Sequence, residues 1–233
     1  MITIEQLEKK YDYTFPKFYK TLFEAGLLDW MRGYNHPLGE GKTWAENVYP
    51  TLKENPPVLL HTGGADFELL TPEEVFNFEF PDDVNLEKHR FVPIAKTAEG
   101  DIYAFYANVE IEGENPVVLI WDEDETEYVA KNFEDFIFRK MLEVTDGIDK
   151  DDLHADYDKE KAIENYRKDI LLDLKSIRPY IKEEYVSILE EAYNGEVLET
   201  LIAFGFVRSK PLNEIFKETI DFDQRGETFD HDL

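Results

Sequence analysis

Residues 91–106 read FVPIAKTAEGDIYAFY, which is two apolar and aromatic runs separated by Glu99-Gly100-Asp101. Aromatic and β-branched residues favour strands, and glycine adopts the positive φ angle of a tight hairpin turn without steric cost. The stretch therefore predicts a β-hairpin with strands at 91–95 and 102–106. The rest of the predicted fold is arranged around this hairpin.

Strand and helix signals continue on both sides of the hairpin. Further strands are predicted at 67–70, 116–121 and 128–130. Helices are predicted to begin at Thr3, Pro16, Thr71 and Asn132. At these positions a capping side chain or a proline suits the first helical turn. Residues 27–57 contain glycines and prolines without a regular apolar pattern, so we expect mostly loop there, with one helical turn near Trp44.

The character of the sequence changes after Val144. A stretch rich in aspartate surrounds Gly147, which is typical of a boundary between modules. From residue 157 to 220, apolar residues recur at helical spacing. We therefore predict an α+β domain over 1–147 and a small all-α C-terminal module over 148–233. The tail from Asp221 is expected to be frayed.

The chain of 233 residues is strongly acidic, with a formal net charge of −27 from 52 acidic and 25 basic residues. Such a field repels nucleic acids and anionic membranes and attracts cationic surfaces. At 42% hydrophobic and 14% aromatic residues, the chain still has enough apolar side chains for a folded core. We therefore expect a folded protein with a basic protein partner and with no nucleic-acid or membrane partner.

Cysteine usage and the N-terminal residues bear on the compartment. The chain contains no cysteine, which excludes disulfides, thiolate metal sites and cysteine nucleophiles. The first residues lack the basic start and the apolar run of a signal peptide. No apolar run approaches the roughly 20 residues that span a membrane. The expected location is the cytoplasm.

The order of these elements resembles the SUKH superfamily, which includes bacterial immunity proteins of toxin systems and fungal regulators of cell-wall synthesis. The resemblance covers residues 1–147 and is carried by several segments in sequence order. They are FPKFYKTLF at 15–23, LLTPEEV at 69–75, FVPIA at 91–95, GDIY at 100–103, PVV at 116–118 and NFEDF at 132–136. The helical segment from Ile148 onward is not part of this resemblance.

The resemblance implies an α+β fold with a curved, mostly antiparallel sheet flanked by helices, and no catalytic apparatus. It also implies protein binding, because many bacterial members are cognate inhibitors that block a secreted toxin, often a nuclease. An acidic inhibitor suits a basic toxin domain, so the net charge agrees with this function. The expected function is neutralisation of a polymorphic-toxin domain by direct binding. A regulatory or scaffolding adaptor that links two protein partners is the alternative.

Acidic residues are densest between positions 97 and 130, where ten acids occur without a base. Most fall in predicted turns, so we expect them to project from the sheet ends and to pair with basic side chains of a partner. Aromatic residues in the same stretch are typical of interface hot spots. The alternatives are charged turns that keep sheet edges soluble and aromatic residues that pack in the core. The predicted partner-binding residues are Glu99, Asp101, Glu110, Glu112, Asp122, Glu123, Asp124, Glu125, Glu127, Trp121 and Tyr128, and the tenth acid is Glu114.

No motif indicates catalysis, a metal or a cofactor. The histidines are scattered without the spacing of a zinc site, and they are His36, His61, His89, His154 and His231. The glycine-containing loop HTGGAD at 61–66 has no adjoining Lys or Arg, so it predicts a turn and not a phosphate site. Residues 221–232 partly match the spacing of a calcium-binding loop, but Arg225 occupies a ligand position, which argues against a calcium site. We therefore expect no catalytic residue, metal or cofactor.

Overall fold

The computed structural model describes residues 2–64, 66–121, 125–149, 159–199 and 203–232. Within these ranges, six strands form an antiparallel sheet in a mixed α+β fold, as predicted. Their spatial order is β1 (Phe67–Leu69), β2 (Phe91–Thr97), β3 (Ile102–Tyr106), β4 (Val117–Ile120), β5 (Glu125–Ala130) and β9 (Thr228–Asp230). The predicted hairpin forms β2 and β3 in the middle of this sheet. Register shifts between β2 and β3 and between β4 and β5 mark β-bulges, which bend a sheet.

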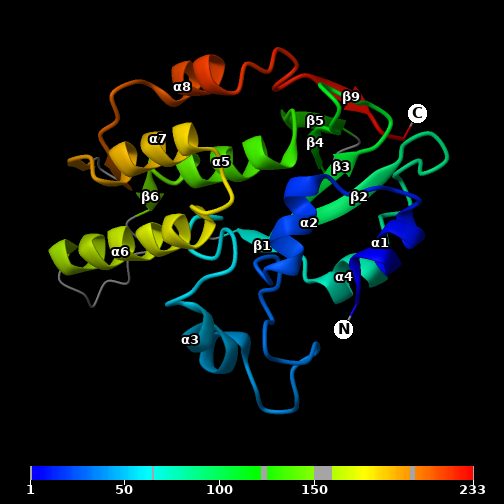
Figure 1. Cartoon of the computed structure of the whole chain (residues 1–233), viewed down its shortest axis with the longest axis horizontal. Helices are drawn as coiled ribbons and strands as arrows, with labels where there is room; N and C mark the ends of the chain where they lie inside the picture. Colours follow the sequence, from blue (N-terminus) through cyan, green and yellow to red (C-terminus); the bar gives the residue numbers. More distant parts are fainter. Residues whose placement is uncertain (1, 65, 122–124, 150–158, 200–202, 233) are drawn as a thin grey trace.

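Helices surround the sheet, and four of them begin at the predicted capping or proline positions. They are α1 (Ile4–Tyr11), α2 (Lys17–Glu24), the π-helix η1 (Trp44–Val48), α3 (Tyr49–Leu52), α4 (Pro72–Asn77), α5 (Phe133–Glu143), α6 (Lys159–Ile177), α7 (Glu183–Tyr193) and α8 (Leu212–Thr219). Thr3 and Thr71 each form a complete capping box, and Asn132 accepts a hydrogen bond from Asp135 N. The loop before η1 and α3 projects from the rest of the fold (Figure 1).

Alternate residues of β3 belong to two different hydrophobic clusters, because successive side chains of a strand point to opposite faces. Tyr103 and Phe105 pack in the larger cluster, and Ile102, Ala104 and Tyr106 pack in the smaller one. Helix α5 contributes to the larger cluster and contacts α2, α7 and α8 as well as β5. The central strand is therefore buried on both faces.

The C-terminal segment contains strands, which corrects the expectation of an all-α module. α6, α7 and α8 confirm its helical part. However, β6 (Ile148–Asp149), β8 (Ala203–Phe206) and β7 (Val197–Glu199) form a small antiparallel sheet. Val197 and Leu198 fit a helical pattern in the sequence, but they pair with Phe206 and Gly205 of β8. Pairing between strands overrides the local pattern here.

The tail from Asp221 is not a frayed end, which corrects a second expectation. β9 lies beside β5 although the two are far apart in the sequence (Figure 1). Phe229 stacks on Tyr106 with ring centroids 4.9 Å apart and lies 5.5 Å from the ring of Tyr128. Burial of these rings against the smaller cluster accounts for the position of β9.

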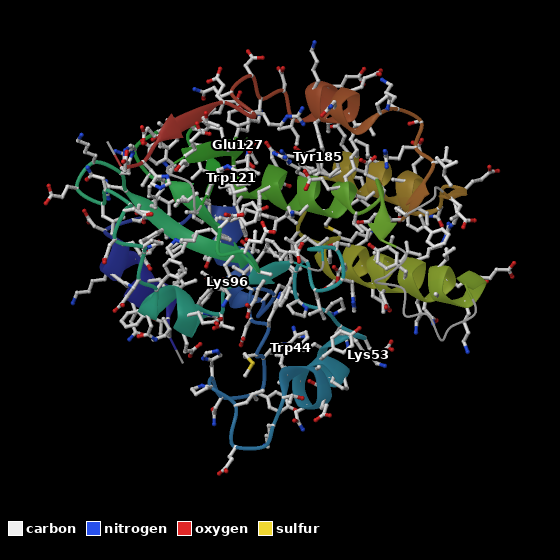
Figure 2. All side chains as sticks on the ribbon, turned by 180° about the vertical axis from the view of Figure 1, so that it is seen from behind. Trp44, Lys53, Lys96, Trp121, Glu127 and Tyr185 are labelled. Carbon is white, nitrogen blue, oxygen red and sulfur yellow. The ribbon has the colours of Figure 1, made fainter. Side chains whose placement is uncertain are left out.

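The C-terminal helices pack into the same core as the sheet domain. Tyr185 of α7, labelled in Figure 2, is buried. Its ring stacks on Phe138 of α5, with ring centroids 4.0 Å apart. Ile170 of α6 and Phe216 of α8 belong to the same cluster as Phe105. The division of the chain at Gly147 stays a prediction, and the shared core provides a way to test it.

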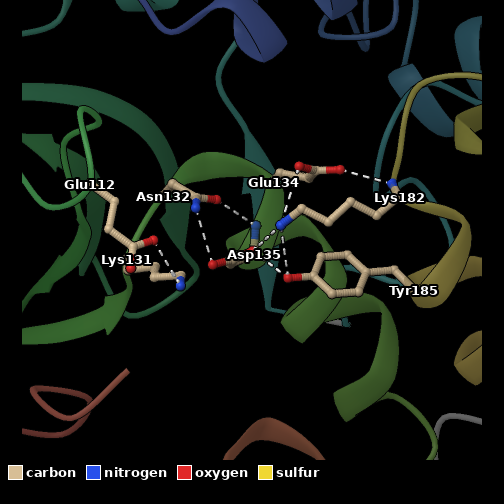
Figure 3. A network of polar contacts seen from close by, with 7 residues as sticks. All are labelled: Glu112, Lys131, Asn132, Glu134, Asp135, Lys182 and Tyr185. Atoms are coloured by element: carbon tan, nitrogen blue, oxygen red, sulfur yellow. Dashed lines mark hydrogen bonds and ion pairs between the residues drawn. The ribbon is translucent and has the colours of Figure 1, made fainter. Parts of the chain in front are cut away.

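A polar network also holds α7 on the start of α5 (Figure 3). Asp135 is fully buried and accepts hydrogen bonds from the Tyr185 hydroxyl at 2.5 Å and from Lys182 Nζ at 3.2 Å. Asn132 Nδ2 donates to the second oxygen at 3.1 Å. Burial alone would lower the pKa of Lys182, but the carboxylates of Asp135 and Glu134 outweigh burial and raise it. The buried carboxylate is thus paired with a charged ammonium group.

Replacing Tyr185 with alanine tests whether the two segments unfold together. Loss of this buried ring should lower the free energy of unfolding by about 3 to 5 kcal/mol. All three tryptophans precede Gly147, so tryptophan fluorescence in a urea titration reports on the N-terminal segment. We expect Tyr185→Ala to shift that fluorescence midpoint, since the core is continuous. An unchanged midpoint would mean that the C-terminal segment unfolds independently. The control is Tyr180→Ala, because Tyr180 is 37% exposed.

Candidate functional site

The strand register places the predicted acids at two opposite ends of the sheet. One row of neighbours crosses the sheet through Lys96, Ile102, Ile120, Thr126 and Phe229. Just beyond this row the chain turns between β2 and β3, and β4 ends and β5 begins near the same row. We define the hairpin end of the sheet by four residues beyond the row, which are Glu99, Trp121, Glu125 and Asp230.

Glu110, Glu112 and Glu114 lie at the other end of the sheet, which we name the helix end because α5 begins there. They belong to the connection between β3 and β4, where Ile111 forms an isolated bridge with Glu114. Glu112 is 75% exposed and forms a 3.1 Å ion pair with Lys131 (Figure 3). A strand rises about 3.3 Å per residue, so the length of β5 separates the two ends by roughly 20 Å. The predicted acids thus form two surfaces.

The hairpin end combines an exposed aromatic ring with carboxylates. Trp121 is 39% exposed, and its backbone N–H donates to Glu125 O at 2.9 Å. Glu125 lies directly opposite Asp230 on the neighbouring strand, and both are exposed. Like charges in this position destabilise a strand pair. Three further predicted residues, Asp122, Glu123 and Asp124, lie outside the described residues.

Several predicted partner-binding residues do not project into solvent. Asp101 is only 8% exposed, and its backbone N–H donates to Thr97 Oγ1 at 3.1 Å. Tyr128 is 9% exposed and packs in the smaller cluster. Glu127 lies inside β5, where it is half-buried (Figure 2). The sequence did not indicate that β9 pairs with β5, so the acids of β5 were predicted to lie in a turn.

Glu127 lines a polar pocket of about 460 Å³ between α5 and α8. Arg139 and Arg225 line the same pocket. Arg139 Nε donates to Glu143 Oε1 at 2.6 Å, and Arg225 Nη2 donates to Asn213 Oδ1 at 3.2 Å. The pocket is lined by three carboxylates and two guanidinium groups, so most of its charge is compensated within the chain and one negative charge is in surplus.

The glycine-containing loop at 61–66 is held by a buried carboxylate from α6. His61 N–H and Thr62 N–H each donate to Asp173 Oδ2 at 2.9 Å, and the Thr62 hydroxyl donates to the same oxygen at 2.8 Å. Burial raises the pKa of Asp173 to about 6, although His61 and the hydrogen bonds from Thr62 act in the opposite direction. The backbone donors that could have bound a phosphate thus bind an anion of the chain itself.

The described histidines make separate contacts. His36 Nε2 lies 3.4 Å from Glu74 Oε1, His89 Nδ1 lies 3.0 Å from the Tyr106 hydroxyl, and His231 Nδ1 lies 3.0 Å from Thr126 Oγ1. His154 lies outside the described residues. Across the described part of the chain, no group of three or more His, Asp or Glu side chains is placed to hold a metal ion. In the same ranges, no helix has the length and apolarity needed to cross a bilayer.

A pocket of about 410 Å³ beside β1 was not predicted from the sequence. Trp30 and Trp44 line it from the projecting loop, and Phe67 and Glu68 line it from β1. Figure 2 shows Trp44 near α3, well away from Trp121. The sequence feature that could have indicated this pocket is the pair Trp30 and Trp44, which lie in a segment without a regular apolar pattern.

The architecture defines an α+β protein of the SUKH type, in which helices flank an antiparallel sheet. The model of the SMI1 / KNR4 family (SUKH-1) matches residues 2–139, and the chain belongs to this family. The match ends within α5, so α6, α7 and α8 follow it. No curated protein and no solved structure matches the chain. Family membership supports an immunity or regulatory role that involves protein partners.

Replacing Asp173 with asparagine should remove a pH dependence from the stability of the fold. The pKa of about 6 lies above the ordinary value of 3.8, so protonation stabilises the folded state. This contribution is fully present below pH 3.8 and is lost as the pH rises through 6. One pKa unit corresponds to about 1.4 kcal/mol, so the contribution is about 3 kcal/mol.

The measurement is the free energy of unfolding of the wild type and of Asp173→Asn between pH 4 and pH 7. The difference between the two values cancels the pH dependence that the other carboxylates contribute to both proteins. The asparagine Oδ1 can accept the same three hydrogen bonds, so Asp173→Asn should fold. We expect the wild type to gain stability relative to the variant as the pH falls. A difference that stays constant over this range would mean that Asp173 does not titrate there.

Proposed function

We propose that this SUKH protein is an immunity-type protein that neutralises a basic toxin domain by binding it through the hairpin end of the sheet. The family supports an immunity or regulatory role in general. The net charge of −27 favours a cationic partner and accelerates encounter with it. Neutralisation requires occupation of the toxin surface and no chemistry on the part of the inhibitor.

The observation that carries this proposal is an exposed tryptophan beside two opposed carboxylates. Trp121 offers the large, rigid apolar surface that is frequent in binding hot spots. The Glu125–Asp230 pair destabilises the isolated chain, and a basic side chain from a partner would relieve that repulsion. Contact with Trp121 and relief of this repulsion can therefore both contribute binding energy. Exposed ion pairs at the edge of an interface would add little to it.

The test compares two double charge reversals that change the net charge equally. The substitutions Glu99→Lys and Glu125→Lys alter the hairpin end, and Glu110→Lys and Glu112→Lys alter the helix end. The partner is sought by pull-down from cells that express the neighbouring open reading frames. We expect the hairpin-end variant to bind that partner at least about 100-fold more weakly, because like charges at an interface cost several kcal/mol. The helix-end variant should change affinity much less.

Lysine at position 125 would face Asp230 with the opposite charge, so the fold should not be weakened. Equal losses in both variants would mean that only the bulk charge matters. An unchanged affinity in the hairpin-end variant would exclude this surface. Measuring the affinity at about 0.05 M and 0.5 M salt separates the contribution of the charges from that of Trp121. Salt screens exposed charges far more than it weakens the apolar contacts of Trp121.

A regulatory or scaffolding adaptor is the second candidate, and one observation favours it. The strand β7 carries Val197 and Leu198, which are 37% and 58% exposed, and Val207 nearby is 48% exposed. Exposed apolar side chains on a strand at the edge of a sheet are typical of sites that pair with another chain. An adaptor would bind a second partner here, while the hairpin end binds the first.

The substitution Leu198→Asp distinguishes the adaptor from the immunity protein. Leu198 is more than half exposed, so aspartate should leave the free energy of unfolding within about 0.5 kcal/mol. For an immunity protein, we expect the variant to bind the toxin as tightly as the wild type. For an adaptor, the variant should lose one partner in the pull-down and still bind the other. The retained partner should be the one whose binding is lost in the variant with Glu99→Lys and Glu125→Lys. Loss of both partners together would contradict the two-surface adaptor.

A further inference from the structure

The pocket beside β1 is built from aromatic rings and carboxylates. Its aromatic residues are Trp30, Trp44 and Phe67, and its acids are Glu68 and Glu74. Met31, Leu38 and Leu69 add apolar surface. Among the described residues that line it there is no Lys or Arg, and His36 is the one basic side chain. A volume of about 410 Å³ lies within the range of pockets that hold small ligands, roughly 300 to 1,000 Å³.

Hydrogen bonds fix the orientation of both indole rings. Trp44 Nε1 donates to Trp30 O at 2.9 Å, and Trp30 Nε1 donates to Val58 O at 3.0 Å. The two rings are nearly parallel, with centroids 6.2 Å apart and an interplanar angle of 29°. Because both N–H groups are used within the chain, the indoles offer π surface to a ligand and no donor. Trp44 also begins the π-helix η1, a rare element that is frequent at functional sites.

The carboxylates are placed to meet a cation at the edge of this aromatic surface. Glu74 Oε2 accepts hydrogen bonds from Thr71 N–H at 2.9 Å and from the Thr71 hydroxyl at 2.8 Å. These bonds hold the side chain, while Oε1 points toward His36 Nε2 at 3.4 Å. Glu68 is 52% exposed and lies 3.0 Å from Lys96 Nζ. At Glu68 an arriving cation would compete with an exposed ion pair, and such pairs are weak.

We propose that this pocket binds an arginine side chain of a protein partner. A planar guanidinium stacks on an aromatic face and can pair with a carboxylate through two parallel hydrogen bonds. Its aliphatic stem would pack on Leu38, which is only partly buried. This inference rests on the proposed function in one respect, which is that the arginine belongs to a basic protein partner. The pocket itself can be tested with a free peptide, so the two proposals can fail separately.

The test titrates the full chain with N-acetyl-Gly-Arg-Gly amide and follows the indole N–H signals of the three tryptophans by NMR. Citrulline has the shape of arginine without its charge, so a citrulline peptide is the matched ligand control. We expect the arginine peptide to bind at least about tenfold more tightly than the citrulline peptide. The Trp30 and Trp44 signals should shift, whereas the Trp121 signal should not.

The matching protein variant carries Glu68→Gln and Glu74→Gln. Glutamine can replace glutamate in the capping box with Thr71, so the variant keeps the start of α4 and loses only the charge. Its affinity for the arginine peptide should fall about tenfold. Glu110→Gln with Glu112→Gln makes the same change in net charge at the helix end and should leave the affinity unchanged.

Four outcomes would overturn the assignment. Equal affinity for the arginine and citrulline peptides would exclude recognition of the charge. Equal affinity for a lysine peptide would exclude recognition of the guanidinium plane. A shift of Trp121 without Trp30 and Trp44 would place the cation at the hairpin end, which would support the proposed function alone. Undiminished binding in the variant with Glu68→Gln and Glu74→Gln would show that these carboxylates do not hold the ligand.

Discussion

Strand β3 is buried on both faces, and this constraint determines how the rest of the chain is arranged. Each face needs its own covering layer, because apolar surface left in water forfeits about 25 cal/mol for each Å². On one face α5 provides the cover and also contacts α2, α7 and α8. On the other face Phe80, Phe222 and Phe229 complete the smaller cluster. The C-terminal tail therefore belongs to the core, although it lies outside the residues that match the family.

Local features of the fold could be predicted from the sequence, and features that depend on distant pairing could not. The turn at Gly100 and the capping boxes at Thr3 and Thr71 are decided within a few residues, so their signals are legible. β9 has only three residues, and its place is decided by β5 and by the rings around Phe229. β7 likewise exists because β8 pairs with it. Cross-strand pairs and burial, which stabilise such strands, leave little trace in a short segment.

The candidate site likewise has local features that could be predicted and long-range features that could not. Placing the acids at the sheet ends needed only the hairpin turns, and Glu99 and Glu110 are exposed in the connections between strands. Assigning them to one surface needed the register, which separates Glu112 from Glu125 by the length of a strand. The aromatic pocket could not be predicted, because Trp30, Trp44 and Glu74 meet only after the projecting loop folds against β1 and α4.

The register also connects the aromatic pocket with the hairpin end. Phe67 in the pocket pairs with Thr97, two residues before Glu99. Neighbouring strands lie about 4.8 Å apart, so the sheet edge from β1 to Asp230 on β9 extends over roughly 25 Å. A standard interface buries about 800 Å² on each partner, which corresponds to a patch about 30 Å across. Under the two proposals, a single basic partner would place an arginine in the pocket and further cations along the same edge, and the helix end would lie outside that contact.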